Sequence, residues 1–373
     1  MKKNLRKSAG EKNKPRQSRG AKLLQMRHYI GVSLLALLFS CTNPREKTDN
    51  ASAYLNIEGQ TMGTYYRITY RDEQKRDVQP AIEKSLFELN AELSTYIDSS
   101  LISDFNRSNK TDLSIPLSAR HFMANLNKSA EIYRSSNGAF DPTVAPLVNY
   151  WGFGYTGSKP LTQIDSSKID SILTLVGFSK LNWTTRGEEV LIRKQLPGVK
   201  LDFNAIAPGY AVDELGRVLE SMQIYDYLID IGGEMLAKGS NPQGENWVVG
   251  ITTPKEGAET TDIQTTVPLH DQALATSGNY RKYYSIKGEK YSHTINPRTG
   301  FPERSKLLSA TVIAPDAMTA DAFATVCMVM GLEKGLALIE SLPNLEAYFI
   351  YGNPKGEMLV KYTSGFKSMM NDK

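Results

Sequence analysis

The sequence predicts an α+β fold, because helical and strand-like segments follow one another irregularly instead of in the strand–helix–strand rhythm of a doubly wound sheet. These segments run from residue 54 to about residue 361 of the 373-residue chain. A charged fraction of 23% and a hydrophobic fraction of 40% are ordinary for a globular protein, which excludes a disordered chain and a polytopic membrane protein. The chain is long enough to bury a large core, either as one unit or as two lobes.

The first predicted elements are two strands and two helices. Residues 54–70 alternate polar and apolar side chains around glycines, which predicts strand, turn and strand. Residues 78–95 and 118–137 carry apolar side chains at helical spacing, so a helix is expected in each. Residues 140–160 are rich in Gly, Pro and aromatic side chains, which predicts a structured loop.

The second half of the chain continues with short elements and contains no internal repeat. Apolar spacing predicts further helices at residues 164–176, 209–222, 318–330 and 333–341. Apolar or alternating runs predict strands at residues 190–193, 200–203, 227–231, 246–251, 272–276, 282–286 and 307–313, with the last strands within 346–361. The polar residues 254–264 predict a surface loop.

The positive charge of the chain is concentrated at its N-terminus. Residues 1–40 hold ten Lys or Arg and one acidic residue, an excess of nine within a total of +4, which leaves −5 for residues 41–373. General nucleic-acid binding needs a basic face, so we expect no nucleic-acid partner. The two cysteines, Cys41 and Cys327, are too few for a disulfide framework or a cysteine-based zinc or iron–sulfur site.

The N-terminal segment has the layout of a secretory signal. Residues 29–39, YIGVSLLALLF, are apolar but too short for a stable membrane span, and they follow a run of positive charge. We therefore expect a signal peptide over residues 1–40. Met26 opens a more typical leader than Met1 does, which indicates that the true start is at Met26.

A cysteine stands directly after this predicted signal. Leu38-Phe39-Ser40-Cys41 resembles a bacterial lipobox, in which the cysteine becomes the lipidated first residue after cleavage. Lipidation is therefore expected at Cys41, and the polar residues 41–53 then form a tether behind the anchor. The alternative is an ordinary signal peptide followed by a chance cysteine.

Three segments combine glycine or proline with a carboxylate. In residues 138–143, Gly and Pro around Asp141 would fix a turn and aim its carboxylate, although a plain Asp-Pro turn is the alternative. In residues 201–213, a predicted strand ends at Asp202 and a helix N-terminus would offer free N–H groups to a phosphate, unless the joint binds no ligand. In residues 230–234, Gly-Gly would allow close approach of a ligand or a strand, or form a packing bulge. The chain has neither a Walker motif nor GxGxxG.

A histidine and a helical Asp–Thr pair are the remaining candidates. His293 is the catalytic candidate, because His121 and His270 are expected at the surface, and a structural role for His293 is the alternative. Asp321 and Thr325 are four residues apart on a predicted helix, so they share a face that suits a hard cation such as Mg²⁺. Capping of this helix by Thr319 or Asp321 is the other interpretation.

Seven motifs in this order resemble the FAD:protein FMN transferase family, the ApbE-type flavin transferases, from about residue 55 to residue 362. They are Thr61–Thr64, Gly138–Asp141, Leu201–Asp213, Ile229–Gly233, Thr276–Tyr280, His293–Gly300 and Ala320–Thr325. The resemblance implies an ApbE-like, T-fold-related domain over residues 54–365, with mixed sheets, flanking helices and FAD in a cleft between two lobes.

The resemblance also implies a reaction. The pyrophosphate of FAD is cut, FMN passes to a Thr or Ser hydroxyl of a target protein as a phosphoester, and AMP leaves, with Mg²⁺ required. The expected targets are flavin-acceptor subunits of Rnf-type or sodium-pumping NADH:quinone reductase complexes. The protein is expected to be a lipoprotein on the periplasmic face of a bacterial membrane, and the inner membrane is the one expected. Two alternatives remain: an Mg²⁺-dependent FAD pyrophosphatase that yields FMN and AMP, and a non-catalytic FAD-binding lipoprotein.

The resemblance assigns roles to residues by position. Mg²⁺ would be held by Asp321 and Thr325 with backbone oxygens of Ala205 and Ala324, and His293 would activate the acceptor. The positions that would contact FAD are Met62, Tyr96, Ala139, Phe140, Asp141, Asp202, Pro208 and Ile295. Pro208 stands where the family often has Lys, which puts a phosphate contact in doubt.

Overall fold

A computed structural model describes residues 53–156, 161–255, 257, 262–280 and 283–371. The predicted signal, the lipidation site at Cys41 and nearly all of the tether lie outside these residues. Within the described part of the chain, no helix is both long and apolar enough to cross a membrane.

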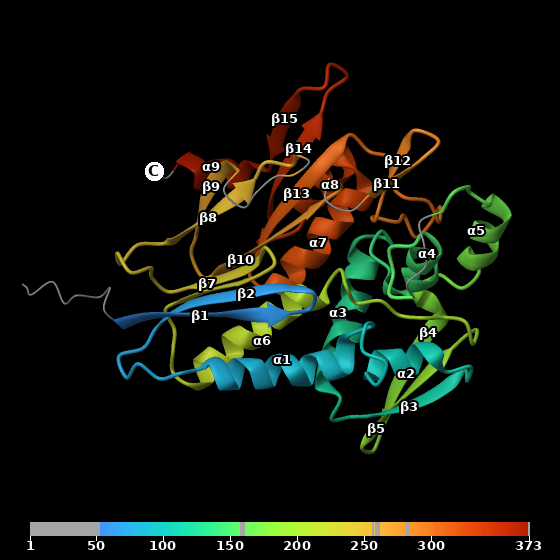
Figure 1. Cartoon of the computed structure of the whole chain (residues 1–373), viewed down its shortest axis with the longest axis horizontal. Coiled ribbons are helices and arrows are strands. Elements are labelled where there is room, and N and C mark those ends of the chain that lie inside the picture. The colour runs from blue at the N-terminus through green and yellow to red at the C-terminus, as the bar shows by residue number, and fades with distance from the viewer. Residues whose placement is uncertain (1–52, 157–160, 256, 258–261, 281–282, 372–373) are drawn as a thin grey trace, which may run out of the picture. The chain divides into compact units, whose positions relative to one another are not determined.

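Eight strands form the main sheet, and all neighbouring strands in it are antiparallel (Figure 1). In spatial order they are β1 (Tyr54–Thr61), β2 (Thr64–Arg71), β6 (Tyr227–Ile231), β7 (Glu234–Lys238), β10 (Gln272–Gly278), β13 (Leu307–Ala314), β14 (Glu346–Gly352) and β15 (Met358–Tyr362). This alternation of hairpins with longer connections confirms the α+β class.

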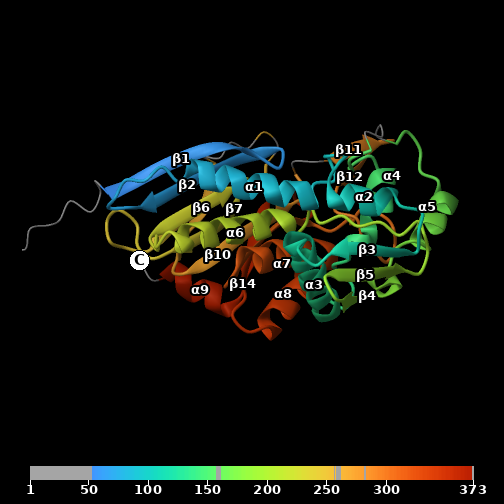
Figure 2. The same ribbon diagram turned by 90° about the horizontal axis from the view of Figure 1, so that it is seen from below.

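The two faces of the main sheet carry different layers (Figures 1 and 2). On one face lie α1 (Gln79–Leu93), α6 (Ala207–Ser221), α7 (Ala317–Met330) and α8 (Leu332–Ser341). On the other lie α9 (Ser364–Asn371) and the hairpin of β8 (Trp247–Thr252) and β9 (Ile263–Leu269). Side chains of β10 alternate between the two layers, since Ala273 and Ala275 pack in the helical core and Leu274 packs under the hairpin.

The remaining elements form two smaller groups. A three-stranded sheet has the order β3 (Asp112–Pro116), β5 (Glu189–Lys194) and β4 (Leu181–Arg186), and it packs with α2 (Leu101–Arg107) and α3 (Arg120–Ser135). An aromatic cluster joins α4 (Ala145–Tyr150), α5 (Ser166–Leu173) and the hairpin of β11 (Tyr283–Ile286) and β12 (Glu289–Ser292). At its centre, the fully buried Trp151 stacks on Tyr291 with ring centroids 5.4 Å apart.

The long periodic segments were predicted well, and the short ones were not. The helices expected at 78–95, 118–137, 209–222, 318–330 and 333–341 are confirmed within two residues at each end. The helix expected over 164–176 spans only Ser166–Leu173, and β3, β4, β7, β9, β12, α2, α4 and α9 were not anticipated. Each of the missed elements is stabilised by its packing neighbours, because such short segments have little intrinsic preference.

The strand predicted at residues 200–203 is wrong. The segment pairs with a side-chain amide and not with a strand: Asn106 Nδ2 donates to Leu201 O at 2.8 Å, and Leu201 N donates to Asn106 Oδ1 at 2.7 Å. The amide thus supplies the two hydrogen bonds that a neighbouring strand would have made.

Candidate functional site

Two turns and two strand ends lie at the same end of the main sheet: the β1–β2 turn, the β6–β7 turn, the end of β10 and the start of β13. The β2–β6 register places Tyr66 opposite Ile231, so the β1–β2 turn at Met62 lies beside the β6–β7 turn. The β10–β13 register places Gly278 opposite Ser309, which brings the last residues of β10 and the first of β13 to that edge. Motifs that are far apart in the sequence are therefore gathered at one end of the sheet.

The Gly-Gly segment makes the turn between β6 and β7. Gly232 and Gly233 have φ of 64° and 113°, and a Cβ on Gly232 would lie 2.8 Å from Thr64 Cγ2. The glycine therefore allows the two turns to pack together, in agreement with the close approach expected from the sequence. Asp230 holds this turn, since its carboxylate accepts from Gly233 N at 2.9 Å and from Tyr65 Oη at 3.1 Å.

Asp321 is a buried carboxylate with one oxygen in use. Oδ2 accepts a hydrogen bond from Gly209 N at 3.1 Å, and no hydrogen bond to Oδ1 is found among the described residues. Burial raises the pKa of Asp321 to about 7, opposed by the Gly209 hydrogen bond and assisted by the nearby Asp213 charge. A cation at Oδ1 would compensate this buried charge.

Two hydrogen bonds made by hydroxyl groups lie between α7, which carries Asp321, and the loop of His293. Thr325, one turn along α7, has its Oγ1 3.1 Å from Ser277 Oγ at the end of β10. Two residues further, Asn279 Oδ1 accepts from Thr294 Oγ1 at 3.0 Å. The structure thus links Thr325 through three residues of the β10 end to the residue next to His293. The His293 ring lies edge-on to Phe153, with centroids 6.3 Å apart.

The donor set suits Mg²⁺. Asp321 and Thr325 present oxygen atoms from one helix face, and Mg²⁺ prefers oxygen ligands, often with only one or two carboxylates. No group of three or more His, Cys, Asp or Glu side chains that could hold a metal ion occurs within the described residues, so a cation here would also need hydroxyl or backbone oxygens as ligands. The buried, incompletely bonded carboxylate of Asp321 is the observation that fits a cation here. The carbonyl contacts expected from Ala205 and Ala324 stay predictions.

The helix N-terminus predicted to hold a phosphate is already occupied, so that expectation is wrong. Ala207 N donates to Phe203 O, Tyr210 N donates to Ile206 O, and Gly209 N donates to Asp321. Pro208 has no N–H and occupies the second helical position, where proline is tolerated. The first turn of α6 therefore has no N–H left for a ligand.

Asp141 is buried and uses both carboxylate oxygens. Oδ1 accepts from Thr143 N and Thr143 Oγ1 at 2.8 and 2.5 Å, and Oδ2 accepts from Phe178 N at 2.9 Å. Burial is the main cause that raises the pKa of Asp141, and these hydrogen bonds oppose it. The carboxylate thus fixes the turn of residues 138–143, and the predicted contacts of Ala139, Phe140 and Asp141 with FAD stay predictions.

Asp202 lies beside this turn. Its backbone N–H donates to Pro142 O at 2.8 Å, and its carboxylate accepts from Asn204 N at 2.8 Å. The pKa of Asp202 is raised by burial, and its charge contributes to the raised pKa of Tyr96, for which burial is again the larger cause. Tyr96 is 66% exposed, so its ring is available to a ligand. The sequence did not single out Tyr155. Burial is the main cause that raises the pKa of Tyr155, and the Asp202 charge raises it further.

The loop of His293 is attached to the same turn. The Arg298 guanidinium donates to Asn137 O, and Trp151 Nε1 donates to Gly300 O at 2.7 Å. Ile295 is buried in the aromatic cluster. Residues 138–143 and 293–300, predicted separately, are thus held together, although neither of two surface hollows, of about 360 and 220 Å³, is lined by a predicted site residue.

Two smaller predictions need correction. The N-cap of α7 is Asp316, whose Oδ1 accepts from Thr319 N at 2.8 Å, and not Thr319 or Asp321. His121 is buried, with 1% exposure, whereas His270 is exposed as expected. His121 shares the buried face of α3 with Phe122 and Asn125, so the helical spacing contained the signal that it points inward.

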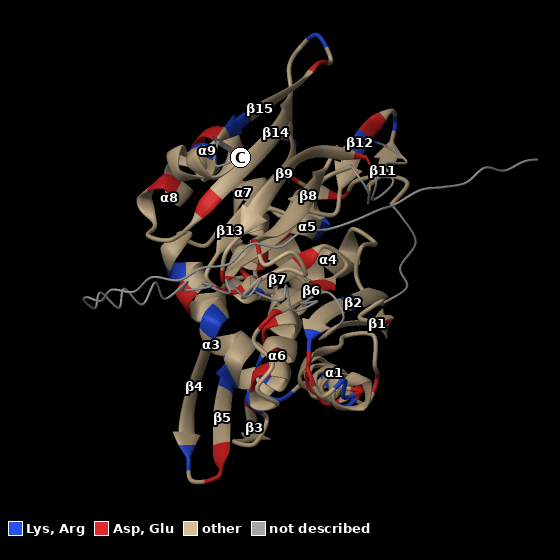
Figure 3. Cartoon of the chain, turned by 90° about the vertical axis from the view of Figure 1, so that its left-hand side faces the viewer, with Lys and Arg blue, Asp and Glu red and all other residues tan. Residues whose placement is uncertain are grey.

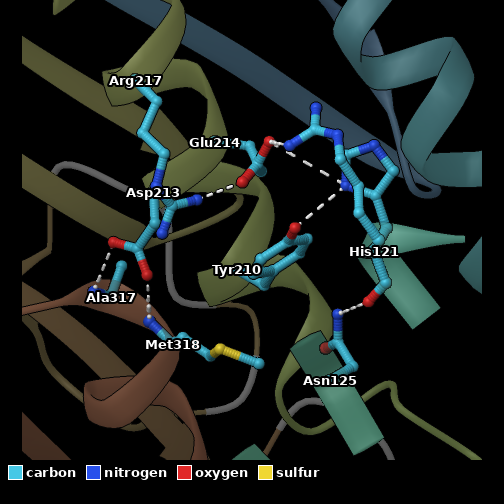
Figure 4. Close-up of polar contacts among 9 residues, drawn as sticks. His121, Asn125, Tyr210, Asp213, Glu214, Arg217, Ala317 and Met318 are labelled. Carbon is cyan, nitrogen blue, oxygen red and sulfur yellow. Dashed lines mark hydrogen bonds and ion pairs between the residues drawn. The ribbon is translucent and has the colours of Figure 1, made fainter. Parts of the chain in front are cut away.

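His121 belongs to a network between α3 and α6 (Figure 4). Its Nδ1 lies 3.0 Å from Tyr210 Oη, and Glu214 pairs with Arg120 at 2.6 Å and also with Arg217. Burial, with the Arg120 charge second, lowers the pKa of His121.

Figure 3 shows that basic and acidic residues are interspersed over the elements seen in that view.

Comparison with known proteins identifies the family. The chain matches the ApbE family over residues 62–349. It is 33% identical over 348 residues to a FAD:protein FMN transferase of Haemophilus influenzae, covering 92% of this chain and 98% of that protein. It is 34% identical over 339 residues to a FAD:protein FMN transferase of Salmonella typhimurium, covering 90% and 92%.

Solved structures agree with this. Flavin transferase ApbE from Vibrio cholerae has a TM-score of 0.74 at 32% identity and covers 85% of this chain and 99% of that chain. The apo form of Pseudomonas stutzeri flavinyl transferase ApbE has a TM-score of 0.73 at 30% identity and covers 86% and 97%. The resemblance drawn from the seven motifs is therefore confirmed, and the chain belongs to the ApbE family.

Proposed function

We propose that this chain is an Mg²⁺-dependent FAD:protein FMN transferase. Relatives of that name match it over nearly their whole length, and the site contains a buried carboxylate with an oxygen not used by the protein. That oxygen, Asp321 Oδ1, is the observation that carries the proposal, because no hydrogen bond among the described residues uses it and a carboxylate oxygen is a ligand that Mg²⁺ prefers.

In this proposal the residues divide the work of phosphoryl transfer. Asp321 and Thr325 would hold Mg²⁺, which would supply positive charge to the pyrophosphate of FAD. The oxygen of the acceptor Thr or Ser hydroxyl forms the new bond to the phosphorus of the FMN half of FAD. His293 accepts the proton that this hydroxyl loses. The bond between that phosphorus and the bridging oxygen of the pyrophosphate breaks, and AMP leaves with the bridging oxygen and the electron pair.

The flavin would lie against the loops that meet at the sheet edge. The candidate contacts are Met62 at the β1–β2 turn, Tyr96 after α1, and the Asp141 and Asp202 segments, which are joined by the hydrogen bond from Asp202 N to Pro142 O. Ile295 would contribute an apolar contact, because it lies in the loop of His293. Pro208 supplies no charge, so phosphate binding would depend on Mg²⁺ more than in relatives with Lys there.

The proposal extends to the location of the protein and to its acceptor proteins. A lipid on Cys41 would anchor the protein at the periplasmic face of a bacterial membrane, beside flavin-acceptor subunits of Rnf-type or sodium-pumping NADH:quinone reductase complexes. The lipobox-like sequence before Cys41 supports the anchor. Mass analysis of the protein recovered from cell membranes, with and without removal of the lipid, tests it.

The first experiment mixes the purified chain with FAD, Mg²⁺ and an acceptor domain that contains the target Thr, with and without EDTA. The intact mass of the acceptor domain is then measured. Gain of one FMN, abolished by EDTA, supports the transferase. Free FMN and AMP without an adduct would favour the FAD pyrophosphatase, and intact bound FAD would favour the non-catalytic carrier.

Two variants test the residue roles in the same assay. Asp321→Ala should abolish turnover while the far-UV spectrum stays unchanged, with Asp316→Ala as the control from the same helix. His293→Ala should lower transfer by at least about 100-fold, whereas the exposed His270→Ala should not change it. Full activity of either site variant would remove the role assigned to that residue.

A further inference from the structure

The N-terminal turns of α6 and α7 cross in backbone contact. A Cβ on Gly209 would lie 2.2 Å from Ala317 O and 2.8 Å from Asp321 Cβ. Both distances are too short for any side chain, so only glycine allows this crossing. We call residues 207–213 and 317–321 together the helix junction.

The first turn of α7 is capped by carboxylates from two helices. Asp213 on α6 accepts from Ala317 N at 2.8 Å through Oδ1 and from Met318 N at 2.9 Å through Oδ2 (Figure 4). The next N–H, from Thr319, goes to Asp316, the N-cap of α7 itself. Three N–H groups that a helix leaves unpaired at its start are therefore satisfied, two of them from α6.

The first turn of α6 is capped in return by α7. Ile206, the N-cap residue, makes no side-chain cap, and the N–H of Gly209 donates to Asp321 Oδ2 at 3.1 Å. Asp213 follows Gly209 by four residues, and Asp321 follows Ala317 by four residues. Each helix thus carries, one turn in, the carboxylate that caps the other, and carboxylates are favourable at helix N-termini.

The far side of α6 is fixed to α3. Tyr210 Oη lies 3.0 Å from Nδ1 of the buried His121 (Figure 4), and Glu214 pairs with Arg120. Because α6 is held from that side, the bonds from Asp213 set where α7 begins. One turn further along α7 is Asp321, whose Oδ1 is the proposed metal ligand.

We propose that Asp213 is a positioning residue for the metal site, because its carboxylate holds α7 on α6 so that Asp321 caps α6 with one oxygen and presents the other to the cation. This inference rests on the metal assignment in the proposed function. Asp213 itself does not touch the cation or the substrate. It acts through the start of α7.

The test measures binding of Mn²⁺ alone to the full chain. Electron paramagnetic resonance reports the concentration of Mn²⁺ that stays free. Asp213→Asn is nearly isosteric, but its amide places an N–H₂ against one of the two donors. We expect Mn²⁺ binding to weaken about tenfold, as for other residues that orient metal ligands. Asp316→Ala is the control, because it removes a cap from the same turn of α7 and leaves the bonds between α6 and α7 in place.

The outcomes separate the two proposals. Wild-type affinity in Asp213→Asn, or equal weakening in Asp316→Ala, would overturn the positioning role. A wild-type chain that binds no Mn²⁺ would instead overturn the metal assignment, and this inference would fall with it.

A second measurement needs no variant. Since binding and capping are coupled, Mg²⁺ should slow hydrogen exchange at the amides of Ala317 and Met318 in the wild-type chain. Equal exchange rates at those amides with and without saturating Mg²⁺ would show that the hydrogen bonds to Asp213 are not coupled to cation binding. The positioning role would then be refuted, even if Asp213→Asn fails to fold.

Discussion

The helix junction differs from the loops that face it in how its atoms are held. In the junction, backbone N–H groups of one helix bond to carboxylates of the other, and Gly209 is in contact with backbone. In the loop layer, which we define as residues 138–144, 200–206 and 291–301, side chains such as Asn106, Asp141 and Trp151 fasten the main chain.

The two kinds of contact differ in how well they should tolerate substitution. Backbone contacts leave no room for adjustment, because moving one helix breaks several hydrogen bonds together. A side-chain clamp loses only its own bonds when it is removed. We therefore expect the metal side of the site to be the more rigid one, and the proposed flavin side to yield more gradually.

The largest effect is expected from Gly209→Ala. The new methyl group would meet Ala317 O at 2.2 Å, and a backbone atom in a helix cannot move aside. Overpacking of this kind should cost about 3 kcal/mol of unfolding free energy or more, measured by urea denaturation. Gly352→Ala in β14 is the control, since its Cβ would lie 4.0 Å from Lys306 O, an ordinary contact distance. Equal midpoints for both variants would show that the junction is not tight.

Asn106→Ala should have the next largest effect. It leaves the N–H and C=O of the buried Leu201 without partners, at a cost of about 2 kcal/mol. The KM for FAD should rise more than kcat falls, because Asp202 loses its support. The exposed Asn127→Ala on α3 serves as the control. An unchanged KM would mean that segment 200–203 keeps its place without the clamp.

Trp151→Phe should act mainly on the loop of His293. The smaller ring keeps the aromatic packing but leaves Gly300 O without its donor, which should cost about 1.5 kcal/mol. Hydrogen exchange should become faster in residues 291–301 and stay constant in α6 and α7. Faster exchange in the helices as well would show that the two regions are not separate.

The smallest effect at neutral pH is a pH dependence that originates at Lys194. Its Nζ is buried and donates to Phe105 O at 2.8 Å, at the end of the helix that carries Asn106. Burial lowers the pKa of Lys194 from 10.5 to about 8.

Between these two pH values the unfolded chain binds a proton that the folded chain does not. The contribution of Lys194 to stability should therefore increase as pH rises from about 8 to about 10.5 and stay constant below that window. Urea midpoints of the wild type and Lys194→Met, compared across the window, measure it, with exposed Lys84→Met as the control. Parallel curves for wild type and Lys194→Met would contradict the prediction.

The fold could be predicted where periodicity was long. The helices at 118–137 and 318–330 have enough turns for apolar spacing to fix their limits and type. Segment 200–203 could not be assigned correctly, because its hydrogen bonds go to Asn106, which is 95 residues away from Leu201 in the chain. Local preference contains no information about such a partner.

The candidate site was predicted in part for the same reason. Spacing alone placed Asp321 and Thr325 on one face of a helix, and the structure agrees. The same spacing did not show that Gly209 N would bond to Asp321, and so it wrongly left the α6 N-terminus open to a phosphate. His121 was placed at the surface because a single histidine was weighed without the helix face around it.

Ordered motifs and helical spacing were enough to identify the family and the α+β class and to nominate candidate site residues, because both signals can be read from short stretches of sequence. What each carboxylate is bonded to could be learned only from the folded chain. Asp141 has both oxygens occupied, whereas Oδ1 of Asp321 accepts no hydrogen bond among the described residues. Asp213, which the sequence placed only within a motif, bridges two helices. These roles depend on which backbone N–H groups come within 3 Å or so of a carboxylate, and that is settled only when the helices cross.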